Sequence, residues 1–219
     1  LNFNATVTGE SNCTTLQSVI GLNEPQTYAR HEGGLSSRAL GNAVHRLLEE
    51  LSRLRTSIDW ESTRSALEQF RPRTLAMIRS SGITGSDAEA IGSQAHQMAL
   101  RASHELTGQW ILSPHRDAAT ETGWSGMISG NLRQIRVDRM FRAGFAPLEP
   151  GEDALWIIDY KTANADAANA ASTVVALRET FAPQLEMYAS ILRNLHGAEI
   201  QIRAGLYYPQ MLLFDWWKI

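Results

Sequence analysis

The sequence contains a single cysteine, no long apolar run and only two lysines. Cys13 alone cannot form an internal disulfide framework, a four-cysteine metal site or an iron–sulfur site. No window reaches the roughly 18 apolar residues that a membrane-spanning helix needs. The N-terminus has neither the basic nor the apolar region of a signal peptide. We therefore expect a cytoplasmic protein that has no iron–sulfur cluster and does not contact a membrane.

An excess of positive charge is also missing. The chain has 20 basic and 23 acidic residues, and its formal net charge is −3. Domains that bind duplex DNA on their own usually have a basic surface. The charge balance instead favours a domain that receives nucleic acid from a partner, or binds it in one local groove. Lys161 and Lys218 are the only lysines, and all other basic residues are arginines.

The 219 residues are enough for one large domain. Residues 1–34 are polar and irregular, with Pro25 and the Gly33-Gly34 pair, and we interpret them as a linker or arm. Because the chain begins at Leu1, we expect it to be a piece of a longer polypeptide. We predict one domain over 35–219, with a helical part over 35–108 and a sheet core over 109–219.

Hydrophobic periodicity predicts helices first and strands later. The expected helices cover 36–55, 59–80 with an interruption near Pro72, 86–106, and 174–196 with a bend at Pro183. The expected strands cover 115–124, 125–130, 131–141, 155–162, 200–207 and 211–216. This order predicts an α/β fold in which helices flank a mixed central sheet.

Two charged residues end a strand that is apolar on both faces. Asp159 and Lys161 follow Trp156-Ile157-Ile158, and positions i and i+2 of a strand point to the same side. Charges at the end of a buried strand are costly unless they are paired or bind an ion. The segment therefore predicts either a structural ion pair or part of an active site.

A second acidic residue lies in the preceding strand. Alternation places Ile135, Val137 and Phe141 on one face and Asp138 on the other. The turn-rich segment 144–153 can return the chain so that Asp138 and Asp159 converge. Two adjacent carboxylates repel each other unless a cation lies between them, and Mg²⁺ prefers one or two carboxylates with water and phosphate.

These residue types are sufficient for phosphodiester hydrolysis. A hard cation on the carboxylates can polarise a phosphoryl oxygen and help to generate hydroxide. The ammonium of Lys161 can orient the attacking water and stabilise the charge that develops on phosphorus.

Asp138 followed by Asp159-Tyr160-Lys161 resembles the metal and lysine motifs of the PD-(D/E)XK nuclease superfamily. Gly41-Asn42-Ala43-Val44-His45 is similar to the Gly-x-x-x-His helix of its RecB-like branch, the nuclease domains of AddA/RecB-type helicase–nucleases and exonuclease V. Gln184-Leu185-Glu186-Met187-Tyr188 resembles the Gln-x-x-x-Tyr helix of that branch. Glu121 stands where many members have a glutamate on the strand before the aspartate.

The resemblance implies a restriction-endonuclease-like fold over roughly residues 35–210 and a role for each motif. His45, Asp138 and Asp159 would bind Mg²⁺ or Mn²⁺, together with the Tyr160 carbonyl. Asp138, Asp159 and Lys161 would form the catalytic set. Gln184 and Tyr188 would hold the substrate strand. For Glu121, a salt bridge is almost as good an explanation as a role in the site.

The resemblance also implies a biological role, in recombinational repair. The domain would cut single-stranded DNA that a helicase motor unwinds, in the same polypeptide or in a partner subunit. Ile135 before Arg136-Val137-Asp138 departs from the family, which often has glycine near this step. Two alternatives stay open, an inactive domain that guides DNA or docks a subunit, and a nuclease for RNA or branched DNA, because phosphate contacts do not identify the sugar or base.

Overall fold

The computed structural model describes residues 34–128, 130–162 and 170–219, without the side chains of 170–172. All of them belong to one compact unit, Gly33–Ile219. The arm expected over 1–34 lies outside the described residues, apart from Gly34.

The N-terminal part is helical, as the periodicity predicts. Asp59 caps the second helix because its side chain accepts a hydrogen bond from Ser62 N at 2.8 Å. Pro72 lies in the first turn of a new helix, so the predicted interruption near it is confirmed. The elements are α1 (Leu35–Arg55), α2 (Trp60–Leu67), a 3₁₀ turn (Glu68–Phe70), α3 (Arg71–Ser80), α4 (Gly85–His104) and α5 (Leu106–Leu112).

Helix α5 corrects the predicted end of the helical part, which extends to Leu112 rather than to residue 108. Glu105 starts this helix by accepting hydrogen bonds from Thr107 N and Gly108 N, at 2.8 and 2.7 Å. A Cβ on Gly108 would lie 2.2 Å from the Ala102 carbonyl oxygen, so this position needs glycine. Gly108 therefore permits close packing of α5 against α4 and does not end the helical part.

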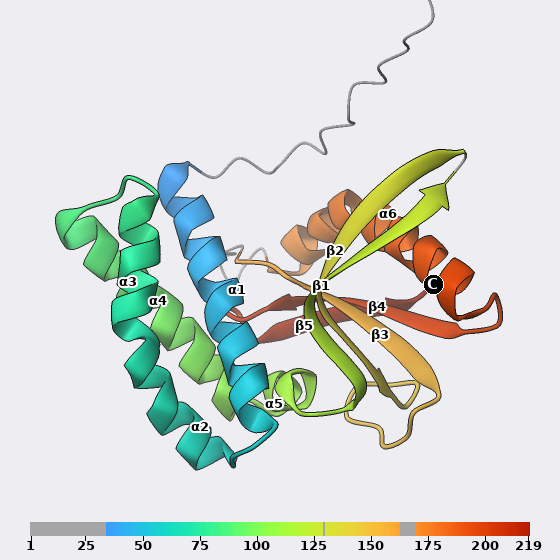
Figure 1. Cartoon of the computed structure of the whole chain (residues 1–219), viewed down its shortest axis with the longest axis horizontal. Coiled ribbons are helices and arrows are strands. Elements are labelled where there is room, and N and C mark those ends of the chain that lie inside the picture. Colours follow the sequence, from blue (N-terminus) through green and yellow to red (C-terminus); the bar gives the residue numbers. More distant parts are fainter. Residues whose placement is uncertain (1–33, 129, 163–169) are drawn as a thin grey trace, which may run out of the picture. The chain divides into compact units, whose positions relative to one another are not determined.

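Five strands form one mixed sheet in the order β1-β2-β3-β4-β5. Strands β3 and β4 are parallel, and the other neighbours are antiparallel. The parallel pair is joined by α6, as a parallel crossover requires. The predicted fold class, a mixed sheet flanked by helices, is confirmed (Figure 1). The bounds are β1 (Arg116–Ile128), β2 (Asn131–Ala143), β3 (Ala154–Tyr160), α6 (Ala170–His196), β4 (Gln201–Tyr208) and β5 (Leu213–Lys218).

Strand β1 corrects another prediction, because 115–124 and 125–130 form one strand rather than two. Ser125 pairs with Gln134 and Gly126 with Arg133, so the ladder continues without a turn. A Cβ on Gly126 would lie 3.0 Å from a methyl group of Ile191. The glycine therefore permits close approach of the β1–β2 hairpin to α6, which runs beside it in Figure 1.

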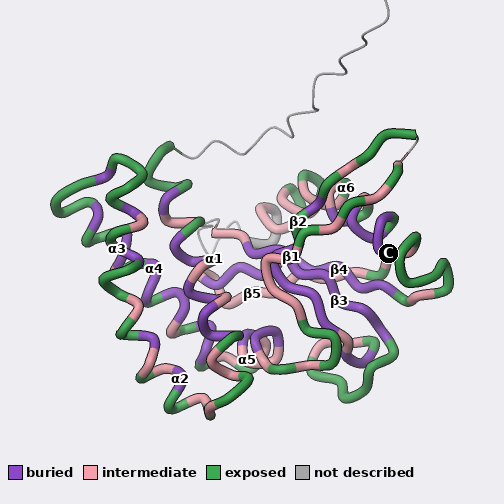
Figure 2. Tube along the Cα trace, in the orientation of Figure 1, coloured by how far each residue is buried: buried purple, intermediate pink, exposed green. Residues whose placement is uncertain are grey.

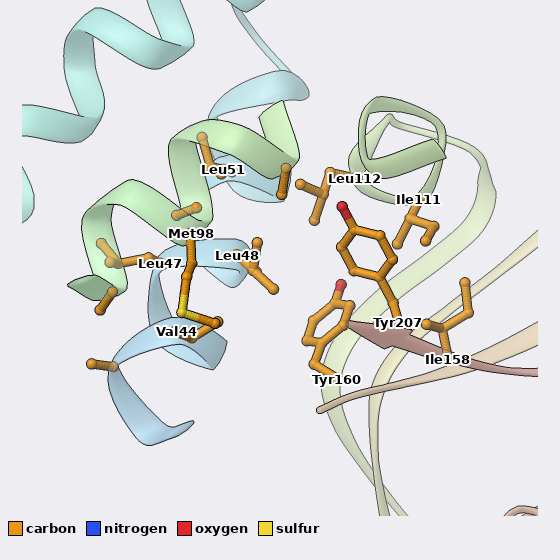
Figure 3. Close-up of a cluster of buried hydrophobic side chains, with 14 of the residues drawn as sticks. Val44, Leu47, Leu48, Leu51, Met98, Ile111, Leu112, Ile158, Tyr160 and Tyr207 are labelled. Carbon is orange, nitrogen blue, oxygen red and sulfur yellow. The ribbon is translucent and has the colours of Figure 1, made fainter. Parts of the chain in front are cut away.

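The sheet has a core on each face. Side chains of α1, α4 and α5 pack on one face, where Figure 3 shows Leu48 near Tyr160 and Leu112 near Tyr207. Helix α6 covers the other face and continues through Pro183. Strand β3 lies between these layers and is buried at every residue (Figure 2), as its apolar run predicts.

Alternation in β2 changes near Asp138, which corrects the predicted face of Phe141. Ile135 and Val137 belong to the core beneath α6, whereas Phe141 belongs to the core beneath α1 and α5. Arg139 shares the side of Phe141, because its Nε donates to the carbonyl of Ile111 in α5. The alternation of inward and outward side chains in β2 therefore shifts by one residue next to Asp138.

Candidate active site

The regular pairing of the sheet is interrupted beside Asp138. The ladder between β2 and β3 reaches its last pair at Arg139 and Ile158. Beyond this pair, the backbone N–H of Tyr160 donates to Asp138 Oδ2 at 2.7 Å. Asp138 is only 8% exposed, and its carboxylate thus takes the place of a strand carbonyl. The strands separate here, and their polar groups become available to a site.

Glu121 reaches the same place through an unusual backbone conformation. Its φ is 52°, in the left-handed region that non-glycine residues rarely adopt. Thr120 is paired with Arg139, which places Glu121 across from Asp138. The kink turns the Glu121 side chain towards α1, where Oε1 lies 3.7 Å from His45 Nδ1.

His45 brings the third group from α1. Its Nδ1 lies 3.4 Å from Asp138 Oδ1. One potential ligand atom from each of His45, Glu121 and Asp138 lies within 4.8 Å of the others. We call these three residues the His–Glu–Asp cluster. It is the one group of this kind found among the described residues, and it joins α1, β1 and β2.

The histidine is oriented as a metal ligand would be. The Tyr160 carbonyl lies 3.0 Å from His45 Nε2 and accepts its N–H, and the two rings meet edge-on at 5.6 Å. In a neutral imidazole this hydrogen bond leaves Nδ1 unprotonated and facing the two carboxylates. Metal-binding histidines characteristically donate their other N–H to a carbonyl or carboxylate. The donor set therefore fits a divalent cation.

Without a metal, the proton on His45 supplies the positive charge. Burial lowers the pKa of His45, but Asp138 and Glu121 outweigh burial and raise this pKa to about 10. Burial alone would raise the pKa of Asp138, yet His45 and the Tyr160 N–H hold that pKa below its usual value. The imidazolium is thus a substitute for the cation that the carboxylates require.

Lys161 is held beside the cluster by two contacts. Its Nζ lies 2.5 Å from Asp159 Oδ2 and 3.6 Å from the ring centre of Phe181 in α6. Burial raises the pKa of Asp159 to about 6, with a further contribution from Asp138, although Lys161 opposes the shift. An ammonium that is fixed in this way can orient water or a phosphoryl oxygen with little reorganisation.

A bound divalent cation would supply Lewis acidity and an activated water at this position. The protein's own groups would supply its ligands, a backbone carbonyl that orients the imidazole, and an ammonium next to it. This combination is suited to cleavage of a phosphodiester bond.

The structure changes the emphasis among the predicted ligands. Glu121, for which a salt bridge was an equal alternative, joins the cluster and also pairs with Arg136 Nε at 2.5 Å. Asp159 contacts Lys161 and is not a member of the cluster. Tyr160 O is the partner of His45 Nε2. The ligand roles of Asp159 and the Tyr160 carbonyl stay predictions.

Gln184 and Tyr188 lie one turn apart on α6 and bond to each other, with Gln184 Nε2 donating to the Tyr188 hydroxyl. Tyr188 is 6% exposed and packs in the core beneath α6, while Gln184 is half-buried. The pair is a structural unit of the helix, and its contact with substrate stays a prediction.

Gly41 lies near the end of β3. A Cβ there would be 3.5 Å from Thr162 Oγ1, which is an ordinary contact. The described residues therefore do not require glycine at this position.

Sequence reasoning missed Arg136 and Phe181, which fix Glu121 and Lys161. Arg136 could have been found, since it lies two residues before Asp138 on the same strand face. Phe181 carries no such signal, because its contact with Lys161 depends on how α6 crosses the sheet.

A mixed sheet with carboxylates and an Asp-x-Lys segment where its central strands separate is an arrangement suited to a metal-dependent nuclease. Residues 15–212 match the family model described as the PD-(D/E)XK nuclease superfamily. The chain belongs to this superfamily, and its Asp138 and Asp159-Tyr160-Lys161 are the segments that resemble its motif. A comparison with curated proteins found no match. None of the described helices is long and apolar enough to cross a membrane.

Proposed function

We propose that the protein is a Mg²⁺- or Mn²⁺-dependent deoxyribonuclease of the RecB-like branch. The observation that carries this proposal is the meeting of three distant segments in the His–Glu–Asp cluster, with Lys161 beside it. A structural ion pair accounts for Asp159 and Lys161, but it gives no reason for two further carboxylates around one histidine. Such a set is costly to bury without a cation, and in the metal-free protein the His45 imidazolium and Arg136 supply that positive charge.

Each residue has a proposed role. His45 and Asp138 bind the metal, and Asp159 joins them when the ion draws its carboxylate from Lys161. Glu121 is a further ligand or holds one through water. Lys161 positions the attacking water, and the Tyr160 carbonyl orients the imidazole or contacts the ion itself.

The proposed substrate is single-stranded DNA, held in part by Gln184 and Tyr188. The net charge of −3 supports delivery of that strand by a helicase, in the same polypeptide or in a partner subunit. The proposed setting is recombinational repair in the cytoplasm, with an action of the exonuclease V type. The similarity of the Gly-x-x-x-His and Gln-x-x-x-Tyr segments to the RecB-like branch supports these finer assignments.

The test combines metal binding with cleavage. Mn²⁺ titration of the chain, followed by calorimetry, should show saturable binding that His45→Ala and Asp138→Ala abolish. Single-stranded DNA should be degraded with Mg²⁺ or Mn²⁺ and not with EDTA, and RNA and branched DNA serve as the competing substrates. Absence of metal binding would instead favour an inactive domain that guides DNA or docks a subunit.

A further inference from the structure

A pocket of about 350 Å³ lies between α1, the α5–β1 connection and the start of the sheet. Its lining includes Glu49, Thr120 and Arg139. Glu49 is one turn beyond the cluster's histidine on α1, Thr120 directly precedes its glutamate, and Arg139 directly follows its aspartate. On α1, β1 and β2, a residue that lines the pocket therefore lies within one turn of a residue of the His–Glu–Asp cluster, or directly next to it in the chain.

The unusual backbone conformation at Glu121 shapes both the pocket and the His–Glu–Asp cluster. Thr120 lines the pocket below α1, and Glu121 also turns to α1, although successive strand residues normally face opposite sides. The positive φ of Glu121 permits this arrangement. In β2 the shift of alternation likewise allows Asp138 and Arg139 to serve adjoining spaces. The cluster and the pocket are consequently built from neighbouring residues of β1 and β2.

Arg139 gives the pocket a buried positive charge. The residue is 3% exposed, and its guanidinium donates to Ile111 O, Thr120 Oγ1 and Ser113 O at 3.0, 3.0 and 2.6 Å. These bonds use three of the five N–H donors of arginine. All three partners are uncharged, and no ion pair joins Arg139 to a described carboxylate. A buried cation without a counter-ion is expensive.

The other charges of the lining are already paired within α1. Glu49 Oε2 lies 2.6 Å from Arg46 Nη1, and Arg53 Nε lies 2.7 Å from Glu50 Oε2. A further polar atom is unused, because Ser52 Oγ is buried and has no hydrogen-bond partner among the described residues. Ser52 is 4% exposed and also lines the pocket. The pocket thus combines one uncompensated cation with one available hydroxyl.

We infer that this pocket binds a phosphate group of the substrate strand, next to the phosphate that is cleaved, through Arg139 and Ser52. The inference rests on the proposed function and adds to it a second anion site. A phosphate is the anion that a nucleic-acid strand brings one nucleotide away from the cleaved bond. Arginine suits it, because the guanidinium presents N–H donors that match the geometry of phosphate oxygens. The volume lies within the range of small-ligand sites.

Binding without metal tests the pocket separately from cleavage. In EDTA, affinities for inorganic phosphate and for a short oligothymidylate would be measured with wild type, Arg139→Gln and Ala118→Leu. Arg139→Gln removes the charge, and Ala118→Leu fills the exposed rim of the pocket without altering Arg139. Both variants should bind about tenfold to a hundredfold more weakly, as for loss of a charged hydrogen bond. Arg139→Gln should also lower the salt slope for the oligonucleotide by about 0.7.

Arg142→Gln is the matched control, because it removes an arginine from the same strand that pairs with Asp117 outside the pocket. It should bind phosphate and the oligonucleotide like wild type. Wild-type binding by both Arg139→Gln and Ala118→Leu would overturn the inference and leave Arg139 as a cap for the carbonyls of α5. If Arg139→Gln fails to fold, Ala118→Leu alone decides between these outcomes.

Oligonucleotides with and without a terminal phosphate identify the source of the bound group. A preference for the phosphorylated end assigns the pocket to a terminal phosphate, and equal affinity assigns it to an internal phosphodiester. In either case, Arg139→Gln must bind these oligonucleotides more weakly than wild type does. Pocket-dependent binding without any metal-dependent cleavage would refute the proposed nuclease activity, whereas cleavage with no dependence on the pocket would refute this inference.

Discussion

The Tyr160 backbone N–H donates to the carboxylate of Asp138, 22 residues earlier in the chain. This bond replaces a main-chain hydrogen bond at the point where β2 leaves β3. It occupies Oδ2 and leaves Oδ1 facing His45. Asp138 therefore has two separable functions, closing the end of the ladder and carrying negative charge into the cluster.

Asp138→Ala and Asp138→Asn should separate these functions. The alanine variant leaves the Tyr160 N–H without a partner and takes from His45 the nearer of its two carboxylates, so we expect a loss of about 3 kcal/mol in the free energy of unfolding. The asparagine variant keeps an acceptor for Tyr160 and should lose clearly less stability. Both should lose Mn²⁺ binding. Urea unfolding in EDTA and calorimetry measure the two effects, and equal stability of both variants would contradict the role in the ladder.

Lys161→Ala should abolish cleavage while leaving ion binding largely intact. Loss of one preorganised charge that stabilises a transition state costs about 10²–10³ in kcat. Lys218→Ala is the matched control, since it removes the only other lysine from an exposed position at the end of β5. Single-turnover cleavage of labelled DNA and Mn²⁺ titration are the measurements. Retained activity in Lys161→Ala would count against the proposed role.

Metal affinity should rise with pH because His45 must lose its proton to become a ligand. Its pKa is raised to about 10 by Asp138 and Glu121, so the metal-free histidine is charged at neutral pH. Release of one proton gives an affinity that increases about tenfold per pH unit. Calorimetry in buffers of different ionisation enthalpy counts the released protons, and an affinity independent of pH between 6 and about 8 would contradict this linkage.

The metal-free protein should lose stability as pH rises. The folded-state pKa of Asp159, about 6, lies above the ordinary 3.8, so its contribution is complete below 3.8 and is lost as pH passes 6. The contribution of His45 is complete below 6.5 and is lost as pH passes 10. In EDTA, the urea midpoint should therefore fall between pH 3.8 and 6, and again between pH 6.5 and 10. Saturating Mn²⁺ should remove the decrease between pH 6.5 and 10. Asp159→Asn should not show the decrease between pH 3.8 and 6.

Much of the fold could be predicted, because its long elements have clear hydrophobic periods. The mixed sheet follows from the strand patterns and from one helical crossover, although six strands were predicted and five are formed. Helix α5 was missed because it has only seven residues and begins at a Glu105 cap beside Gly108. The single strand β1 was predicted as two strands because glycine, here Gly126, is common in turns. The glycine is instead explained by its close contact with Ile191, which is distant in the sequence.

The meeting of His45 with Asp138 was predictable from motif order, since each lies at a fixed place on its own element. The importance of Glu121 was not, because period-two alternation cannot show a residue with positive φ. For the same reason, alternation could not show that Thr120 and Glu121 both lie on the side of α1. Long-range support from Phe181 likewise depends on tertiary packing and has no local pattern.

Gly41→Ala tests whether the glycine serves the fold or the substrate. Alanine should raise the free energy of unfolding by up to about 1 kcal/mol, because it favours a helix interior and a Cβ meets Thr162 only at 3.5 Å. If the strand approaches α1 at this point, KM should increase while metal affinity is unchanged. Unchanged KM would assign the glycine no part in substrate binding.

Glu121→Gly asks whether backbone strain is retained for the sake of the cluster. Glycine adopts a φ of 52° without penalty, so the metal-free variant should gain about 1 kcal/mol from relief of strain, less what the Arg136 pair contributes. Its Mn²⁺ affinity should fall at least tenfold, because one carboxylate leaves the cluster. Asp117→Gly is the matched control, since Asp117 has a φ of 53° in the same strand and pairs with Arg142 away from the cluster. That control should change stability similarly without altering Mn²⁺ binding. If both variants bind Mn²⁺ like wild type, Glu121 is not a ligand, and its conformation serves only the turn of the strand towards α1.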